Sequence, residues 1–112
     1  MIDITLHGNP QSTNHIYRHR GSITYMTKEG KDLKESYKLQ LKNQYKRKPI
    51  EGEVDLRVEL FFGDKRVRDI DNYNKILLDA CTGILWIDDK QIMSLYIVKN
   101  YDKENPRIEL TL

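Results

Sequence analysis

The sequence is poor in cysteine and has no long hydrophobic run. Cys81 is the only cysteine among 112 residues, which excludes an internal disulfide and a zinc site built from thiolates. Its apolar neighbours predict a small core residue. No run approaches the ~18 apolar residues of a membrane helix, and Met1-Ile2-Asp3-Ile4 lacks the basic and apolar layout of a secretory signal. We therefore expect a cytoplasmic protein with no membrane partner.

Glycine-rich phosphate loops and internal repeats are also missing. The first absence disfavours a nucleotide cofactor, and the length leaves room for one domain, residues 1–112. The net charge of +2 says little about partners, but the charges are unevenly distributed. Between Lys28 and Lys48 there are eight basic residues against three acidic ones, whereas carboxylates gather in residues 69–89.

Apolar residues that alternate with polar ones predict three strands. These are residues 2–6, 54–60 and 108–112. Residues 9–26 predict a long loop or a loose hairpin, with residues 23–26 extended. Residues 91–101 look extended and precede a turn at residues 102–106, so we expect a hairpin at the C-terminus.

Helical spacing of apolar residues marks two further segments. The first is predicted to run from an N-cap at Thr27 to about Tyr45. The second starts near Asp69 and is predicted to end at Gly83 in a left-handed conformation. Together the segments predict an α+β fold: a single small domain in which a mixed β-sheet of about four to five strands packs with two helices.

Two carboxylates stand where a charged loop enters the second helix. Asp69 and Asp71 are two residues apart, so both can bend toward one cation if the backbone there is still extended. Oxygen-only ligands select hard ions such as Mg²⁺. Lys75 follows Asp71 by one helical turn and can sit near a bound phosphate, either as a protonated charge stabiliser or as a neutral base. The sequence leaves both roles of the lysine open.

Four blocks of the sequence resemble the signature of the RusA family of Holliday junction resolvases, in the same order and at the same spacing. The blocks are Arg68-Asp69-Ile70-Asp71-Asn72, Lys75, Asp79-Ala80 and Leu85-Trp86-Ile87-Asp88-Asp89-Lys90-Gln91-Ile92. In addition, Asn9 to Arg18 resembles the family's N-terminal Pro-Ser-Asn-Tyr-Arg stretch, and Arg107 to Leu110 resembles its last strand. The resemblance extends over most of the chain.

This resemblance implies a homodimer that cuts four-way DNA junctions by paired symmetric nicks during recombination and repair. The implied cofactor is Mg²⁺, with Mn²⁺ as a substitute. Asp69, Asp71 and Asp89 match the family's acidic triad and are the expected metal ligands, and Lys75 matches its essential lysine. Cutting a two-fold symmetric junction needs two sites, and one chain has ligands for only one, so a C2 dimer is the economical arrangement.

Basic and donor residues that can contact junction DNA lie in three places. They are the lysine stripe Lys34, Lys38 and Lys42, the charged loop with Lys65, Arg66 and Arg68, and the N-terminal loop with Asn14, Tyr17, Arg18 and Arg20. An alternative from another class stays open: a non-catalytic basic DNA-binding module whose aspartates cap a helix.

Overall fold

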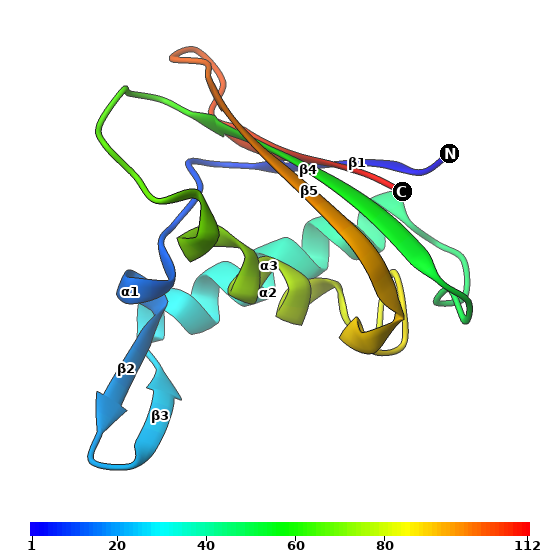
Figure 1. The fold of residues 1–112 in the computed structure, drawn as a ribbon, viewed down its shortest axis with the longest axis horizontal. Coiled ribbons are helices and arrows are strands. Elements are labelled where there is room, and N and C mark those ends of the chain that lie inside the picture. The colour runs from blue at the N-terminus through cyan, green and yellow to red at the C-terminus, as the bar shows by residue number, and fades with distance from the viewer.

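A four-stranded sheet with two helices on one face makes up the body of the molecule. The computed structural model describes residues 1–112, and Figure 1 shows both helices on the same side of the sheet. The strands are β1 (Asp3–His7), β4 (Val54–Phe62), β5 (Ile92–Tyr101) and β6 (Arg107–Thr111), in the order β1-β6-β4-β5. β6 pairs antiparallel with β1 and β4, whereas β4 and β5 are parallel. The predicted α+β class and mixed sheet are confirmed.

The predicted C-terminal hairpin is wrong. β5 and β6 are both strands, but β4 lies between them. Parallel pairing of β4 with β5 requires a crossover connection, which is made by the short 3₁₀ helix η1 (Ile70–Tyr73) and helix α3 (Asn74–Cys81). The alternate apolar residues of β4 are all buried and favour a central position, whereas β5 has no fully buried residue and forms an edge.

The first predicted helix is confirmed as α2 (Lys28–Gln44), with Thr27 as its N-cap. Gly30 in its first turn is buried against Ile16, where an added Cβ would lie 2.6 Å from Ile16 Cγ2. The glycine therefore permits a close approach that any side chain would prevent.

Two glutamines of α2 cover the edge of the sheet formed by β1. The Gln44 side chain accepts a hydrogen bond from the Thr5 amide at 2.9 Å and donates to the Thr5 carbonyl at 2.7 Å. Gln40 accepts from the His7 amide at 2.8 Å. These bonds satisfy backbone groups that an edge strand otherwise leaves free for another chain. β5, at the opposite edge, exposes most of its side chains.

For the N-terminal segment, predicted as a long loop or a loose hairpin, the structure shows the hairpin: β2 (Tyr17–Arg20) pairs with β3 (Ile23–Met26). Gly21 turns between them at a φ of 62°. A one-turn helix, α1 (Thr13–Ile16), precedes the hairpin and was not predicted. In Figure 1 the hairpin projects away from the sheet and the two main helices.

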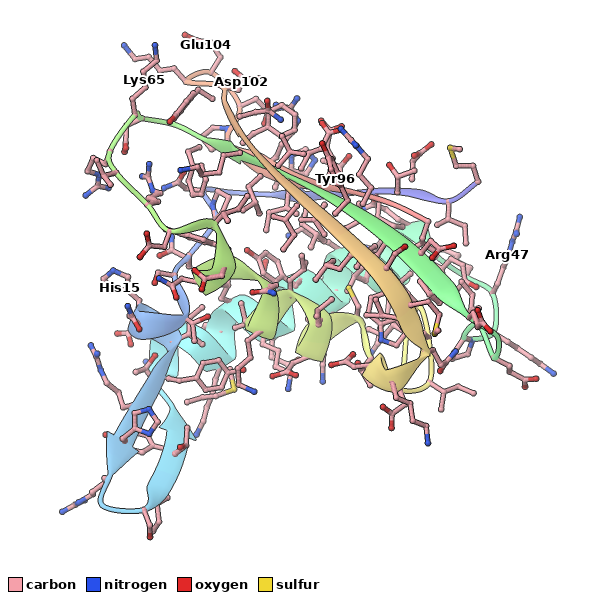
Figure 2. All side chains as sticks on the ribbon, viewed as in Figure 1. His15, Arg47, Lys65, Tyr96, Asp102 and Glu104 are labelled. Carbon is pink, nitrogen blue, oxygen red and sulfur yellow. The ribbon has the colours of Figure 1, made fainter.

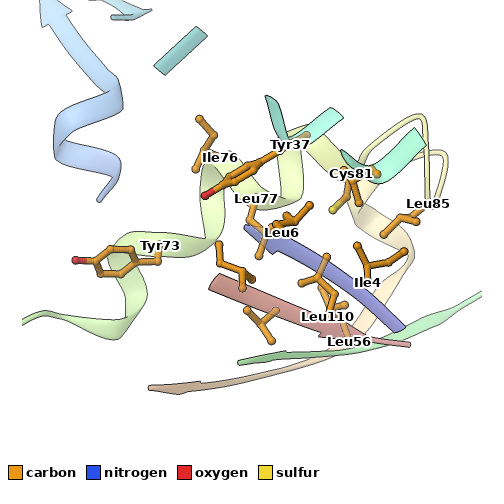
Figure 3. Packing of buried hydrophobic residues seen from close by; sticks show 14 of the residues in the cluster. Ile4, Leu6, Tyr37, Leu56, Tyr73, Ile76, Leu77, Cys81, Leu85 and Leu110 are labelled. Atoms are coloured by element: carbon orange, nitrogen blue, oxygen red, sulfur yellow. The ribbon is translucent and has the colours of Figure 1, made fainter. Parts of the chain in front are cut away.

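The core fills the layer between the sheet and the helices. Figure 3 shows residues of the strands, such as Leu6, Leu56 and Leu110, facing residues of the helices, such as Tyr37 and Leu77. Cys81 is fully buried, as predicted. Gly83 has a φ of 89°, which confirms its predicted left-handed conformation. None of the helices has the length and apolarity needed to cross a membrane.

Candidate active site

Asp69 and Asp71 stand at the start of η1 with exposed side chains. Asp69 has an extended backbone, with φ −87° and ψ 122°, and its side chain makes no capping hydrogen bond. Asp71 occupies the first turn, and neither carboxylate takes part in an ion pair. Asp69 therefore occupies the N-cap position, as predicted, but its side chain does not cap the helix. Both carboxylates have oxygen atoms free to bind a cation.

The loop before this pair is held by Arg68. Its guanidinium donates to the Asp64 carboxylate at 2.8 Å, lies 4.3 Å from the centre of the Phe62 ring, and has a side chain only 9% exposed. The backbone amide and side chain of Arg66, followed by the Arg68 guanidinium, lower the pKa of Asp64 to about 2. Lys99 of β5 donates to the Arg68 carbonyl at 2.9 Å. Arg68, predicted as a DNA contact, is thus engaged in fixing the backbone that leads to Asp69.

Lys75 lies one turn into the crossover, where it meets two other side chains. Its Nζ is 3.5 Å from Asp79 Oδ2 and 5.0 Å from the centre of the Tyr17 ring. The Tyr17 hydroxyl donates to the same Asp79 oxygen at 2.7 Å. Burial of the ring, and then this hydrogen bond, raise the pKa of Tyr17 well above its usual value. Asp79 therefore joins the root of the hairpin to the lysine.

Asp89 lies at the other end of α3, in the 3₁₀ helix η2 (Asp89–Gln91). Its Oδ1 accepts a hydrogen bond from the indole of Trp86 at 2.9 Å and another from the Thr82 hydroxyl. The Trp86 indole also donates to Thr82 at 3.1 Å. One carboxylate oxygen is thereby fixed, and the other is left for a ligand.

The neighbouring Asp88 has a different task. Its side chain accepts from the Lys90 amide at 3.0 Å, and the Gln91 side chain accepts from the Asp88 amide at 2.9 Å, so the two form a capping box around η2. The structure thus separates the adjacent acids, with Asp88 shaping the turn and Asp89 facing Trp86.

A hollow of about 330 Å³ opens beside Asp89. It is lined by polar residues from two helices and the turn: Lys34, Lys38, Asp79, Thr82, Asp88 and Asp89. Lys34 and Lys38 are half-buried here, whereas Lys42 is exposed further along α2. Two of the three predicted stripe lysines therefore lie beside a predicted metal ligand.

The three predicted metal ligands do not meet within one chain. No cluster of three or more His, Cys, Asp or Glu residues is arranged to hold a metal ion. Asp69 and Asp71 precede α3, and Asp89 is bonded to Thr82 just after it. Eight helical residues span about 12 Å at 1.5 Å per residue. The predicted ligands therefore form two separate groups, one at each end of α3, and we refer to these groups as half-sites.

The remaining predicted contacts lie around the first half-site and the hairpin. Arg66 and Arg68 line a hollow of about 220 Å³ together with His15. Asn14, Tyr17 and Arg18 line another of about 440 Å³ at the root of the hairpin. Arg20 is exposed near the hairpin turn, and Figure 2 shows Lys65 on the outer end of the charged loop.

Comparison with known proteins shows to which family the chain belongs. Residues 7–112 match the family described as Endodeoxyribonuclease RusA. The chain belongs to the RusA family. Similar proteins include the crossover junction endodeoxyribonucleases RusA of Escherichia coli strain K12 and Shigella sonnei, each 33% identical over 92% of this chain and 87% of the relative. The enzyme of Enterobacteria phage 82 is 32% identical over the same shares.

Some residues that contact the predicted site side chains were not identified from the sequence. The notable omissions are Thr82, which fixes Asp89, and the contact of Tyr17 with Asp79 across 62 residues. The contact of Thr82 with Asp89 had no helical signal, because the helix ends at Cys81, before both residues. Nothing in the local pattern indicates that Tyr17 approaches Asp79, because that contact depends on where the hairpin docks. Cys81 is fully buried, and this burial raises the pKa of its thiol well above the usual value.

Proposed function

We propose that this RusA-family protein cuts four-way DNA junctions by hydrolysing phosphodiester bonds, with paired symmetric nicks, in recombination and repair. The similar proteins of Escherichia coli and Enterobacteria phage 82 are crossover junction endodeoxyribonucleases. The observation that carries the proposal is the pair of free carboxylates, Asp69 and Asp71, one helical turn from Lys75. A DNA-binding module whose aspartates cap a helix has no need of such a pair, and Asp69 does not act as a cap.

The cofactor that we propose is Mg²⁺, with Mn²⁺ as a substitute, held by Asp69, Asp71 and Asp89. The donor set fits this choice, because it contains only carboxylate oxygens, and hard cations prefer oxygen. A bound divalent cation would activate water and neutralise charge on the phosphoryl oxygens. Trp86 and Thr82 bind one oxygen of Asp89, which leaves its other oxygen available to the cation.

For Lys75 we propose the role of a charge stabiliser. Its ammonium group lies beside the Asp79 carboxylate and over the face of the Tyr17 ring, two neighbours that attract a cation. A protonated lysine can donate to a phosphoryl oxygen as negative charge develops there. Asp79 and Tyr17 restrict the directions that the long side chain can take.

We further propose that the two half-sites are completed across a C2 homodimer. Symmetric nicking needs two sites related by a two-fold axis, and in one chain Asp89 is separated from Asp69 and Asp71 by the length of α3. A second copy can supply the missing half to each site.

The edge strand β5 is the surface that we propose for this dimer. It is ten residues long and carries exposed apolar side chains, among them Met93 at 62% and Tyr96 at 58%. The opposite edge is already covered by α2. Two copies of β5 paired antiparallel around a two-fold axis would continue the sheet.

This strand pairing would also bring the half-site of one chain close to the complementary half-site of its partner. β5 begins directly after η2, which contains Asp89, and its far end contacts Arg68 through Lys99. In an antiparallel pair the start of one strand lies beside the end of the other. Asp89 of one chain would therefore approach Asp69 and Asp71 of its partner, on the same face of the extended sheet.

A junction-cleavage assay tests the proposed function. Wild-type protein with Mg²⁺ or Mn²⁺ is expected to cut a synthetic four-way junction and to leave linear duplex uncut, and Ca²⁺ serves as the control for binding without cutting. Asp71→Asn should abolish cutting while retaining junction binding, because the change reduces local negative charge. The matched control is Asp55→Asn on the outer face of β4. An intact junction with wild-type protein, or full cutting by Asp71→Asn, would reject the proposal.

A further inference from the structure

One face of the β2–β3 hairpin gathers two arginines and two apolar residues. In the strand register Arg18 is opposite Tyr25 and Arg20 is opposite Ile23. Opposite residues, and residues two apart, share a face of a strand pair. The hairpin face thus consists of Arg18, Arg20, Ile23 and Tyr25, and all four are exposed, Ile23 at 65% and Tyr25 at 47%.

The other face of the hairpin is different in kind. Tyr17 and Met26 are half-buried at its root, and His19 and Thr24 bond to each other at 3.0 Å. On this second face, therefore, only the side chains at the root of the hairpin pack against the rest of the protein. The hairpin face exposes an aliphatic side chain and an aromatic ring to solvent. This exposure costs free energy, and a two-stranded ribbon by itself has little stability to offset that cost.

The positive charge around the hairpin face favours the binding of a polyanion. No acidic residue occurs between Ile4 and Lys28. The combination of guanidinium groups with an exposed ring and an aliphatic wedge is suited to nucleobases, which stack on aromatic and guanidinium planes when they are unpaired. Paired bases in a duplex do not offer these stacking surfaces.

The root of the hairpin lies beside Lys75, so the hairpin face is close to the proposed active site. Tyr17 is the first residue of β2, and its ring lies 5.0 Å from Lys75 Nζ. A strand of four residues reaches about 13 Å at 3.3 Å per residue. When a DNA phosphate is bound at Lys75, the hairpin face can therefore reach bases that are a few nucleotides away from that phosphate.

We propose that the hairpin face packs against nucleobases that are unstacked at the branch point of the junction, and that this contact provides selectivity for junctions over duplex. The lysines of α2 are suited to phosphate, which duplex and junction both present. This inference rests on the proposed function and deepens it by naming the part of the substrate that the hairpin binds.

The test uses a synthetic four-way junction with 2-aminopurine beside the branch point and Ca²⁺ in place of Mg²⁺. Wild-type protein is expected to raise the 2-aminopurine fluorescence, because the base loses its stacking neighbours. The double variant Ile23→Ser/Tyr25→Ser should lose this rise and bind the junction more weakly by on the order of tenfold. Its affinity for linear duplex should stay within about twofold of wild type, because the phosphate contacts are retained.

Matched variants separate the hairpin face from general effects. Leu39→Ser removes an equally exposed apolar side chain, at 63%, from α2, and Thr24→Ala alters the opposite face of the hairpin; both should behave as wild type. Tyr25→Trp should retain the fluorescence rise, since it keeps an aromatic surface. Thermal unfolding of every variant checks that the fold is intact.

Two outcomes overturn the inference. One is equal weakening on junction and duplex, and the other is an unchanged fluorescence rise in the double variant. If wild-type protein neither binds nor cuts the junction, the proposed function fails as well. Normal junction cutting by wild type together with an unaffected double variant rejects the hairpin's role alone.

Discussion

The adjacent residues Asp88 and Asp89 offer the sharpest comparison between single side chains. Asp88→Ala removes the N-cap of η2 and should cost about 1 kcal/mol of stability, while junction cutting at saturating Mg²⁺ stays near wild type. Asp89→Asn should abolish cutting, because the proposed cation loses a carboxylate ligand. Urea unfolding and cutting rates measure the two effects separately. Cutting that depends on Asp88 and tolerates Asp89→Asn would reverse the assignment.

Asp79 is expected to act on the reaction through Lys75. Asp79→Asn weakens the ion pair with Lys75 and leaves the lysine less restricted, and a misplaced catalytic group slows the reaction by roughly ten- to a hundredfold. The loss should appear in the single-turnover rate, with junction affinity nearly unchanged. Glu59→Gln, a removal of negative charge on the outer face of β4, is the control. A fall in affinity that matches the fall in rate would assign Asp79 to DNA binding or folding.

Among elements, the contact between α1 and α2 depends on Gly30. Alanine is the better helix former by about 1 kcal/mol, yet Gly30→Ala should destabilise the protein. Its Cβ would lie 2.6 Å from Ile16 Cγ2 and 2.9 Å from the Ile16 carbonyl oxygen, and such overpacking costs about 1–3 kcal/mol. Urea unfolding measures the balance. A more stable Gly30→Ala variant would show that the hairpin root can move away from α2 at little cost.

The charged loop between β4 and η1 should respond to acid. The pKa of Asp64 in the folded protein, about 2, is below its ordinary value because the Arg66 amide and the Arg66 and Arg68 side chains stabilise the carboxylate. Their contribution to loop order is therefore fully present above about pH 4, and it is lost as the pH falls through 2. An NMR pH titration that follows the Asp64 carboxyl and the Arg68 side-chain signals measures this loss of loop order. In Asp64→Asn the Arg68 signals should not follow such a titration.

At the scale of the whole molecule, short-range patterns predicted much of the fold, and long-range contacts account for what was missed. The N-cap at Thr27, the alternation in β4 and the left-handed Gly83 depend on neighbours along the chain, and all three are confirmed. The parallel pairing of β4 with β5 depends on how α3 packs, which no local pattern records. The separation of Asp89 from Asp69 was missed for the same reason, because spacing in sequence does not give distance across a helix.

Subunit mixing tests whether the half-sites are completed between chains. Asp71→Asn and Asp89→Asn are each expected to be inactive alone. In a mixed dimer one shared site would combine both substitutions, and the other would combine the intact Asp71 of one chain with the intact Asp89 of its partner. An equal mixture should therefore regain about a quarter of wild-type nicking, from one working site in half of the dimers. The regained activity should consist of single nicks in place of paired ones.

The control for mixing is a variant that prevents the dimer. Tyr96→Asp places a charge on the exposed side of β5 and should weaken strand pairing between copies. Mixing Asp71→Asn with Asp89→Asn when both also carry Tyr96→Asp should then restore nothing, and sedimentation should show monomers. Sites complete within single chains would give no recovery in any mixture of the two aspartate variants. A dimer that survives Tyr96→Asp and still recovers activity would locate the interface away from β5 while keeping the shared site.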